Sequence, residues 1–221
     1  MLGPAIFSVV IAFLIGGIPF GFLVARVVLK DDIRKHGSGN IGATNVGRVC
    51  GWKWGSLVLV LDALKGLLPT LACHWLASST SSVHLMQLLT ILTGISAIAG
   101  HMFPVWLGFK GGKGVATALG VVLVISWKAS LVALLFFVIT VVLSRMVALA
   151  SIAAALAFMV TQLSLQGSKT LDPTYLPMTV FSIVIPLLII WRHRSNIQRI
   201  LRGEENRIGA GKPSSEETEK H

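Results

Sequence analysis

Residues 4–28, PAIFSVVIAFLIGGIPFGFLVARVV, make an apolar stretch that precedes the polar, glycine-rich loop 37–48, GSGNIGATNVGR. A membrane-spanning helix needs about 20 apolar residues to cross about 30 Å of hydrocarbon, and this stretch is long enough. A second loop of the same kind, GFKGGKG at residues 108–114, interrupts the apolar sequence again. This alternation predicts an all-α, polytopic integral membrane protein with glycine-rich loops between its spans.

The composition of the 221-residue chain agrees with a membrane protein. Hydrophobic residues make up 54% of the chain and charged residues 13%, with a mean hydropathy of +0.79. An ordinary soluble domain has about 25% charged residues, so that class is excluded. The formal net charge of +10 is concentrated between and after the apolar stretches. Membrane topology, anionic lipid and an anionic substrate explain it better than nucleic acid, which we do not expect as a partner.

Seven apolar stretches are candidate transmembrane helices. They cover residues 4–28, 55–77, 84–103, 115–126, 129–143, 147–165 and 175–191. The fourth and fifth are short and are separated by Trp127 and Lys128. Merging them would place Lys128 in the middle of the bilayer at a cost of at least a few kcal/mol. We therefore predict seven spans, with six as the alternative.

The distribution of lysine and arginine predicts the orientation of these spans. With the N-terminus outside, both glycine-rich loops and the C-terminal tail share one basic face, and the opposite face receives only Lys128 and Lys169. The positive-inside rule makes the basic face cytoplasmic. The first stretch has no basic segment before it, so we expect a retained span rather than a cleaved signal peptide. Residues 1–202 should form a single transmembrane domain, followed by a polar, disordered cytoplasmic tail at 203–221.

The first loop has the composition of a phosphate site. Its glycines at 37, 39 and 42 match a dinucleotide fingerprint, but that motif requires a βαβ unit, and both flanks here are membrane helices. Glycine nevertheless permits close backbone approach to an anion, and Arg48 can hold two of its oxygen atoms. Neutral hydrogen bonds would come from Ser38, Asn40, Thr44 and Asn45. The alternative is a flexible polar connector.

The second loop precedes an apolar helix directly. We predict that the backbone N–H groups of Gly111, Gly112 and Gly114 point from the helix N-terminus toward an anion, to which Lys113 adds a positive charge. The loop lacks the Walker A pattern, so we expect no ATP hydrolysis. Lys110 could contact the substrate or extend to the lipid headgroups.

A third basic cluster, RHRSNIQR at 192–199, follows the last span. His193 and Asn196 would share one face of a helix and could hydrogen-bond a substrate hydroxyl. The alternative is an ordinary positive anchor at the membrane surface. Within the second span, Asp62 and Lys65 form a pair of opposite charges that is often structural.

Four motifs carry a resemblance to a known family: GSGNIGATNVGR (37–48), DALKG (62–66), GHMFPVWLGFKGGKGVATALG (100–120) and RHRSNIQRI (192–200). Over nearly the whole chain, to about Arg202, the sequence resembles the bacterial acyl-phosphate:glycerol-3-phosphate acyltransferases, the PlsY family. The resemblance implies a seven-helix enzyme of the bacterial cell membrane with its active site toward the cytoplasm. It also implies transfer of a fatty acyl group from acyl phosphate to the 1-hydroxyl of sn-glycerol 3-phosphate. The products would be lysophosphatidate and inorganic phosphate, in the first step of phospholipid biosynthesis.

The resemblance also implies roles for individual residues. We expect the catalytic residues to be Ser38, Arg48, Lys113, His193 and Asn196. Substrate or phosphate binding is expected of Gly37, Gly39, Asn40, Gly42, Thr44, Asn45, Gly111, Gly112, Gly114 and Ser151. The family usually has an acidic residue where this chain has Ser195, and loss of an acid that braces the tail helix would affect stability more than chemistry.

The expected chemistry is direct attack by the glycerol hydroxyl on an activated acyl group. The sequence contains no His-x-x-x-x-Asp motif and no convincing Ser-His-Asp set, so we expect no covalent acyl-enzyme. Neither metal, cofactor nor protein partner is required. The proton acceptor could be His193 or an oxygen of the substrate phosphate. Alternative classes are a transporter of phosphorylated metabolites and a membrane phosphotransferase or phosphatase.

Overall fold

The computed structural model describes residues 2–78 and 82–209 of the chain. Within these two ranges every regular element is helical and no strand occurs, which confirms the all-α prediction there. Short 3-10 helices lie at Ile33–Lys35, Val105–Leu107 and Gly167–Leu171. The α-helices are α1 (Leu2–Gly16), α2 (Phe20–Leu29), α3 (Ala43–Cys50), α4 (Trp52–Ala77), α5 (Val83–Met102), α6 (Val115–Ile125), α7 (Trp127–Ser144), α8 (Val147–Gln166), α9 (Leu176–Arg192) and α10 (Arg194–Leu201).

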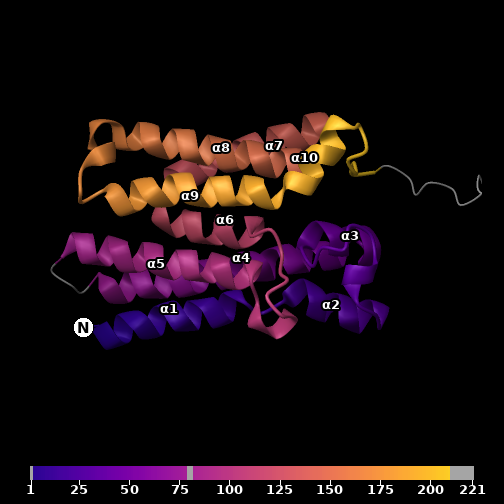
Figure 1. Cartoon of the computed structure of the whole chain (residues 1–221), viewed down its shortest axis with the longest axis horizontal. Helices are drawn as coiled ribbons and strands as arrows, with labels where there is room; N and C mark the ends of the chain where they lie inside the picture. The colour runs from indigo at the N-terminus through magenta and orange to yellow at the C-terminus, as the bar shows by residue number, and fades with distance from the viewer. Residues whose placement is uncertain (1, 79–81, 210–221) are drawn as a thin grey trace, which may run out of the picture.

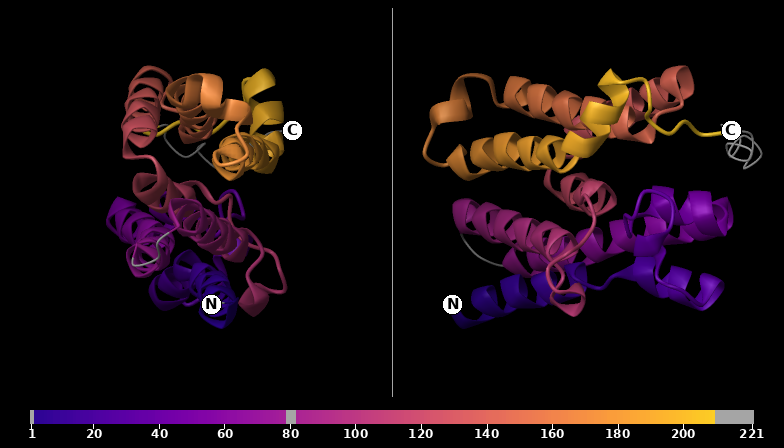
Figure 2. Two further views of the ribbon diagram at one scale, coloured as in Figure 1. Left: turned by 90° about the vertical axis from the view of Figure 1, so that its left-hand side faces the viewer. Right: turned by 45° about the vertical axis from the view of Figure 1, so that its right-hand side comes forward.

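The helices form two layers that are joined by α6 (Figure 1). One layer contains α1, α2, α4 and α5, and the other contains α7, α8 and α9; both views of Figure 2 show α6 between them. α4 packs against α5 and α6, while α7 packs against α8. The short α3 and α10 lie at the same end of the two layers, at the right of Figure 1.

Glycines allow α6 to approach α4 closely. A Cβ atom at Gly66 of α4 would lie 2.2 Å from the carbonyl oxygen of Thr117, and one at Gly120 of α6 would lie 2.0 Å from that of Ala63. Both distances are far below van der Waals contact, so only glycine fits at these crossing points. The tight crossing fixes where the loop before α6, which carries Lys113, sits relative to α4.

Within the described residues, five segments are long and apolar enough to cross a membrane: Phe7–Leu29, Trp52–Ala77, Val83–Leu107, Trp127–Ser144 and Val147–Leu171. Helices α9 and α10 pass the same test together and are bent by 57° at His193, which makes a sixth candidate. The predicted fourth and fifth spans are separate helices, but α6 has 11 residues. At 1.5 Å per residue it is about 16 Å long, roughly half the hydrocarbon thickness.

The first predicted span is broken where Pro19 stands. α1 ends at Gly16 and α2 begins at Phe20, because proline has no N–H group and cannot continue a helix from the preceding turn. The carbonyl oxygen of Ile18, at this break, accepts a hydrogen bond of 2.7 Å from Lys65 Nζ. Lys65 also lies 2.7 Å from the carboxylate of Asp62, and both side chains are buried. The intramembrane charge pair thus stabilises a broken helix.

The C-terminal tail begins with a packed segment. Whereas the sequence predicts disorder from Gly203, residues 203–209 are described and contact the rest of the molecule. Glu205 is buried, and the backbone N–H of Ile208 donates to the carbonyl oxygen of Arg145 at 2.8 Å. The remaining part of the predicted tail, residues 210–221, lies outside the described residues.

Candidate active site

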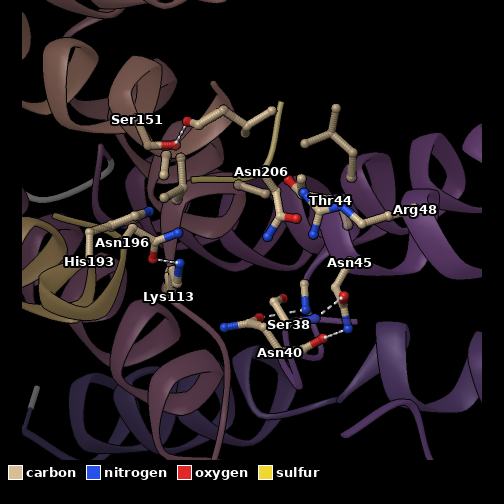
Figure 3. A pocket seen from close by; sticks show the side chains of 18 of the residues that line it. Ser38, Asn40, Thr44, Asn45, Arg48, Lys113, Ser151, His193, Asn196 and Asn206 are labelled. Atoms are coloured by element: carbon tan, nitrogen blue, oxygen red, sulfur yellow. Dashed lines mark hydrogen bonds between the residues drawn. The ribbon is translucent and has the colours of Figure 1, made fainter. Parts of the chain in front are cut away.

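One pocket brings together all three polar clusters of the sequence (Figure 3). It lies where α3, the loop before α6, the start of α8 and the α9–α10 junction meet. The residues predicted for the site that line it are Ser38, Asn40, Gly42, Thr44, Asn45, Arg48, Lys113, Gly114, Ser151, His193 and Asn196. Segments separated by more than 150 residues in the sequence therefore form one cavity.

Asn45 organises the first loop. Its side chain is buried, and its Oδ1 accepts a hydrogen bond from the backbone N–H of Ser38 at 2.9 Å. Its Nδ2 donates to the carbonyl oxygens of His36 at 3.1 Å and Asn40 at 2.9 Å. The Oδ1 atom of Asn40 in turn accepts from the N–H of Gly42 at 2.7 Å, at the start of α3. Because these amides hold the backbone, Ser38 has a fixed position at the pocket wall.

Gly37 and Gly39 give this loop its shape without lining the pocket. Gly37 has a φ of +59°, and a Cβ atom there would lie 2.3 Å from Asn45 Oδ1. Gly39 also has a positive φ, of +69°. The left-handed conformation is readily available only to glycine. These two predicted binding residues therefore permit the turn whose backbone the Asn45 side chain holds by hydrogen bonds.

Arg48 follows Thr44 by one turn of α3 and lies on the opposite side of the pocket from Lys113 (Figure 3). Among the described residues its guanidinium has no hydrogen-bond partner, although it lines the pocket. A free guanidinium presents a fork of N–H donors that matches two oxygens of a phosphate. Arg48 is therefore available to a ligand anion.

The second loop differs from its prediction in one respect. The N–H groups of Gly111 and Gly112 donate to the carbonyl oxygens of Met102 and His101, at 3.2 and 3.1 Å. They are thus used inside the protein, and neither glycine lines the pocket, so they do not face an anion as expected. The reason is that the loop folds back on the end of α5 before α6 begins. Gly114, with a φ of +83°, does line the pocket at the N-terminus of α6.

Lys113 carries the positive charge of this loop into the pocket. Its Nζ donates a hydrogen bond to Oδ1 of Asn196, on α10. Burial of the ammonium group lowers the pKa of Lys113 from 10.5 to about 8, and the nearby charges of Arg199, Arg192 and Arg48 act in the same direction. The carboxylate of Glu205 opposes this shift. Lys110, whose role the sequence left open, does not line the pocket.

His193 is buried at the junction of α9 and α10. Its Nδ1 lies 2.8 Å from the carbonyl oxygen of Ile189. A carbonyl only accepts, so Nδ1 carries the hydrogen and Nε2 has a free lone pair. Burial, reinforced by the charge of Lys113, lowers the pKa of His193 from 6.5 to about 4. The neutral imidazole can therefore accept a hydrogen bond from a ligand hydroxyl.

Ser151 marks the boundary between the polar pocket and an apolar groove. Its hydroxyl donates to the carbonyl oxygen of Val147 at 2.8 Å, and the residue lines both cavities. The groove runs between α6, α7, α8 and α9, and small side chains keep it open: Ala118, Ala133, Ala154 and Ala155. A cationic pocket that opens into an apolar groove can hold an anion and an alkyl chain at the same time.

Five polar or charged residues that line the pocket are not among the predicted site residues: Asp62, His101, Arg199, Glu205 and Asn206. Arg199 belongs to the same basic cluster as Asn196 and could have been included, whereas nothing in the sequence distinguishes buried Glu205 from exposed Glu204. Ser195 is exposed and does not line the pocket. Across residues 2–78 and 82–209, no group of three or more His, Cys, Asp or Glu side chains is placed to hold a metal ion.

The fold and the pocket define a class: helical membrane proteins with a cationic pocket that opens into an apolar groove. Comparison with known proteins agrees. The family model for glycerol-3-phosphate acyltransferases matches residues 6–203, so the chain belongs to this family. This confirms the resemblance seen in the four motifs.

Individual relatives cover most of the chain. The glycerol-3-phosphate acyltransferase of Prochlorococcus marinus (strain NATL1A) is 42% identical over 198 residues, which are 89% of this chain and 94% of the relative. That of Myxococcus xanthus (strain DK1622) is 42% identical over 200 residues, or 90% of this chain and 97% of the relative.

Two crystal structures of PlsY, an integral membrane glycerol 3-phosphate acyltransferase, share the fold and 42% sequence identity. The glycerol 3-phosphate form has a TM-score of 0.82, and the lysophosphatidic acid form has a TM-score of 0.78. Each comparison covers 94% of this chain and 96% of PlsY.

Proposed function

We propose that this protein transfers a fatty acyl group from acyl phosphate to the 1-hydroxyl of sn-glycerol 3-phosphate, giving lysophosphatidate and inorganic phosphate. The observation that carries this proposal is the junction at Ser151, where a pocket with Arg48 and Lys113 meets a groove lined by alanine and other apolar side chains. Both substrates match this junction. Each has a phosphate for the cationic pocket, and the donor also has an alkyl chain for the apolar groove. Lysophosphatidate has the same two parts.

The reaction needs one bond to form and one to break. The 1-oxygen of glycerol 3-phosphate attacks the acyl carbonyl carbon, and the bond from that carbon to the phosphate oxygen of the donor breaks. Arg48 and Lys113 neutralise the phosphates and hold the two substrates in line, which is the main source of rate acceleration here. Loss of either cation should cost on the order of 2–4 kcal/mol in the transition state.

The remaining predicted catalytic groups orient the acceptor. Nε2 of His193 accepts a hydrogen bond from the glycerol moiety, Ser38 lines the same pocket, and Asn196 fixes Lys113. The proton of the attacking hydroxyl passes to a phosphate oxygen. A phosphate with a second pKa of about 6 is a better base than His193, whose pKa is about 4. No covalent acyl-enzyme is needed, because acyl phosphate is already activated.

For the topology we propose seven membrane segments, with α6 as a short one enclosed between the two layers. The N-terminus lies outside, and both loops and the C-terminus are cytoplasmic, in the bacterial cell membrane. The membrane segments lie within residues 1–202, the packed segment 203–209 completes the pocket, and the reaction begins phospholipid synthesis. The clustering of basic residues at the pocket end supports this orientation.

The test uses the purified protein with acyl phosphate and glycerol 3-phosphate, and measures phosphate release and lysophosphatidate formation. We expect turnover that is insensitive to EDTA and is absent with acyl-CoA in place of acyl phosphate. Folded Arg48→Ala and Lys113→Ala variants should lose about 30-fold or more in kcat/KM. Preference for acyl-CoA, or full activity of both variants, would overturn the proposal.

A separate measurement addresses the topology. Ser38→Cys and Lys113→Cys variants, made with Cys50 and Cys73 replaced by serine, are treated with a membrane-impermeant thiol reagent in oriented vesicles. Both positions should react from the cytoplasmic side. Reaction from opposite sides would exclude a shared pocket.

A further inference from the structure

A buried carboxylate from the tail lies among the cations of the pocket. Glu205 follows α10 and has only 8% of its surface exposed, whereas its neighbour Glu204 is exposed. Carboxylates are seldom buried unless they are paired, so the position of Glu205 requires specific partners. Both of its oxygens have one.

The partners of Glu205 connect the tail to Lys113. Its Oε1 accepts a hydrogen bond from Asn196 Nδ2 at 2.8 Å, and its Oε2 accepts from Arg199 Nε at 2.9 Å. With Nδ2 directed to Glu205, the Oδ1 of Asn196 is directed to Lys113 Nζ. An amide oriented the other way would place NH₂ against the ammonium and the carbonyl oxygen against the carboxylate. Only one orientation of Asn196 therefore satisfies both neighbours.

We propose that Glu205 is a positioning residue of the acyltransferase: through Asn196 it fixes the ammonium of Lys113 in the phosphate pocket. This inference rests on the proposed function. Both carboxylate oxygens of Glu205 are bound to side chains of α10, so it acts through those side chains. It places one of the three N–H donors of Lys113 on Asn196 and leaves the other two for substrate oxygens.

The charge of Glu205 has a second effect on the same lysine. The charged side chains that act on Lys113 are Arg48, Arg192, Arg199 and Glu205, and Glu205 is the only acid among these four. Its carboxylate keeps the pKa of Lys113 from falling further below about 8. Without that charge, the ammonium would lose its proton at a lower pH, and phosphate binding would weaken in the neutral range.

A purely structural role would predict something different. Glu205 also forms an ion pair with Arg199, which by itself would attach the tail to α10. Loss of that attachment would lower activity equally at every pH. A positioning role through Lys113 predicts a change in pH dependence.

The experiment compares Glu205→Gln with Glu204→Gln, an adjacent and exposed control. The readouts are kcat/KM for glycerol 3-phosphate and, independently of turnover, the binding of inorganic phosphate by calorimetry, both as functions of pH. In the wild type we expect binding to weaken as pH rises through about 8, since the charge of Lys113 is present below its pKa and lost above it. Glu205→Gln should shift this alkaline limb of the binding curve to a pH about one unit lower, and Glu204→Gln should leave the limb in place.

A second background tests whether the effect passes through Lys113. In Lys113→Arg the cation does not titrate, so adding Glu205→Gln should produce no alkaline shift in phosphate binding. Glu205→Asp, which keeps the charge, serves if Glu205→Gln does not fold, and it should keep the limb near that of the wild type. A uniform loss at all pH values, or a shift that persists with Lys113→Arg, would overturn the inference. An inactive wild type that still shows the binding shift would instead refute the proposed function.

Discussion

Arg192 Nη2 donates a hydrogen bond of 2.7 Å to the carbonyl oxygen of Gly112 and a second, of 3.0 Å, to that of Gly111. The last residue of α9 thereby holds the loop that precedes α6, 80 positions earlier in the chain. The same loop carries Lys113 into the pocket. Two short parts of the sequence that both contribute pocket residues are thus fixed to each other by one guanidinium.

Substitution of Arg192 should loosen the second loop without removing a substrate contact. Hydrogen bonds to charged groups are worth about 1.5–3 kcal/mol each, and Arg192→Gln loses two. We expect kcat/KM for glycerol 3-phosphate to fall at least about tenfold, since Lys113 is less well placed. Arg194→Gln is the control, because Arg194 is exposed and stacks on Trp191 at 4.6 Å. Equal effects of the two substitutions would show that only the positive charge at this surface matters.

Asn45 should be the residue of the first loop that tolerates change least. Asn45→Ala removes three hydrogen bonds and leaves the N–H of Ser38 and the carbonyl oxygens of His36 and Asn40 without this partner. Each unsatisfied buried group costs about 1–3 kcal/mol, so the loop should open and thermal unfolding should occur at a lower temperature. Activity should be lost with it. Cys50→Ala, in the same short helix, is expected to leave both measurements close to the wild type.

The sequence predicted which residue types make up the site better than it predicted the structural role of each residue. Residue types in the two glycine-rich loops predicted a shared cationic pocket, because glycine, arginine and lysine have few other reasons to cluster between apolar spans, and residues of both loops line one pocket. Which loop residues face the pocket and which ones hold the loop in shape depended on tertiary contacts. Gly37 and Gly112 were expected to bind an anion, yet one shapes a turn around Asn45 and the other is clamped by Arg192. Glu205 could not be separated from Glu204, because only the packed structure decides which of two adjacent acids is buried.

The sequence likewise predicted the main helices of the fold but not the details that depend on contacts between helices. Hydropathy located the long helices, since about 20 apolar residues have few soluble alternatives. It did not locate the break at Pro19 inside the first span, where the apolar composition continues unchanged on both sides. The break follows from Pro19, and it is stabilised by Lys65, a residue of another helix that hydrogen-bonds the carbonyl oxygen of Ile18.

The pH dependence on the acid side should not come from His193. The pKa of His193 is lowered to about 4, so the imidazole gains a proton only as pH falls through about 4 and is neutral throughout the physiological range. The acid limb of kcat/KM should follow the second ionisation of the substrate phosphate, near pH 6. His193→Gln should lower kcat by about tenfold, through a lost hydrogen bond, with the limb in the same place. If the limb disappeared in this variant, His193 would be the titrating base.

The apolar groove should set the length of acyl chain that the enzyme accepts. Ala155 lines the groove one helical turn beyond Ser151, or about 6 Å along α8. A phenylalanine there would fill the groove, so Ala155→Phe should reduce kcat/KM for hexadecanoyl phosphate at least about tenfold and affect octanoyl phosphate far less. Leu156→Phe is the matched control, since Leu156 is 41% exposed on the outer face of the same helix. An equal loss for both donors would place the alkyl chain elsewhere.

Asp62 and Lys65 should act on stability as a unit. Their charged atoms lie 2.7 Å apart, and the side chains are 3% and 2% exposed. Removal of one member leaves a buried charge without its partner, so Asp62→Asn or Lys65→Met should each destabilise the protein by about 3–5 kcal/mol. The double variant should recover part of this loss but not all, because the carbonyl oxygen of Ile18 still lacks its donor.

Thermal unfolding in detergent of the wild type, the two single variants and the double variant measures the coupling between Asp62 and Lys65. The KM for glycerol 3-phosphate of the double variant should stay within about threefold of the wild-type value. A stable double variant with a KM raised beyond tenfold would mean that Asp62, which also lines the pocket, binds substrate rather than braces the helix.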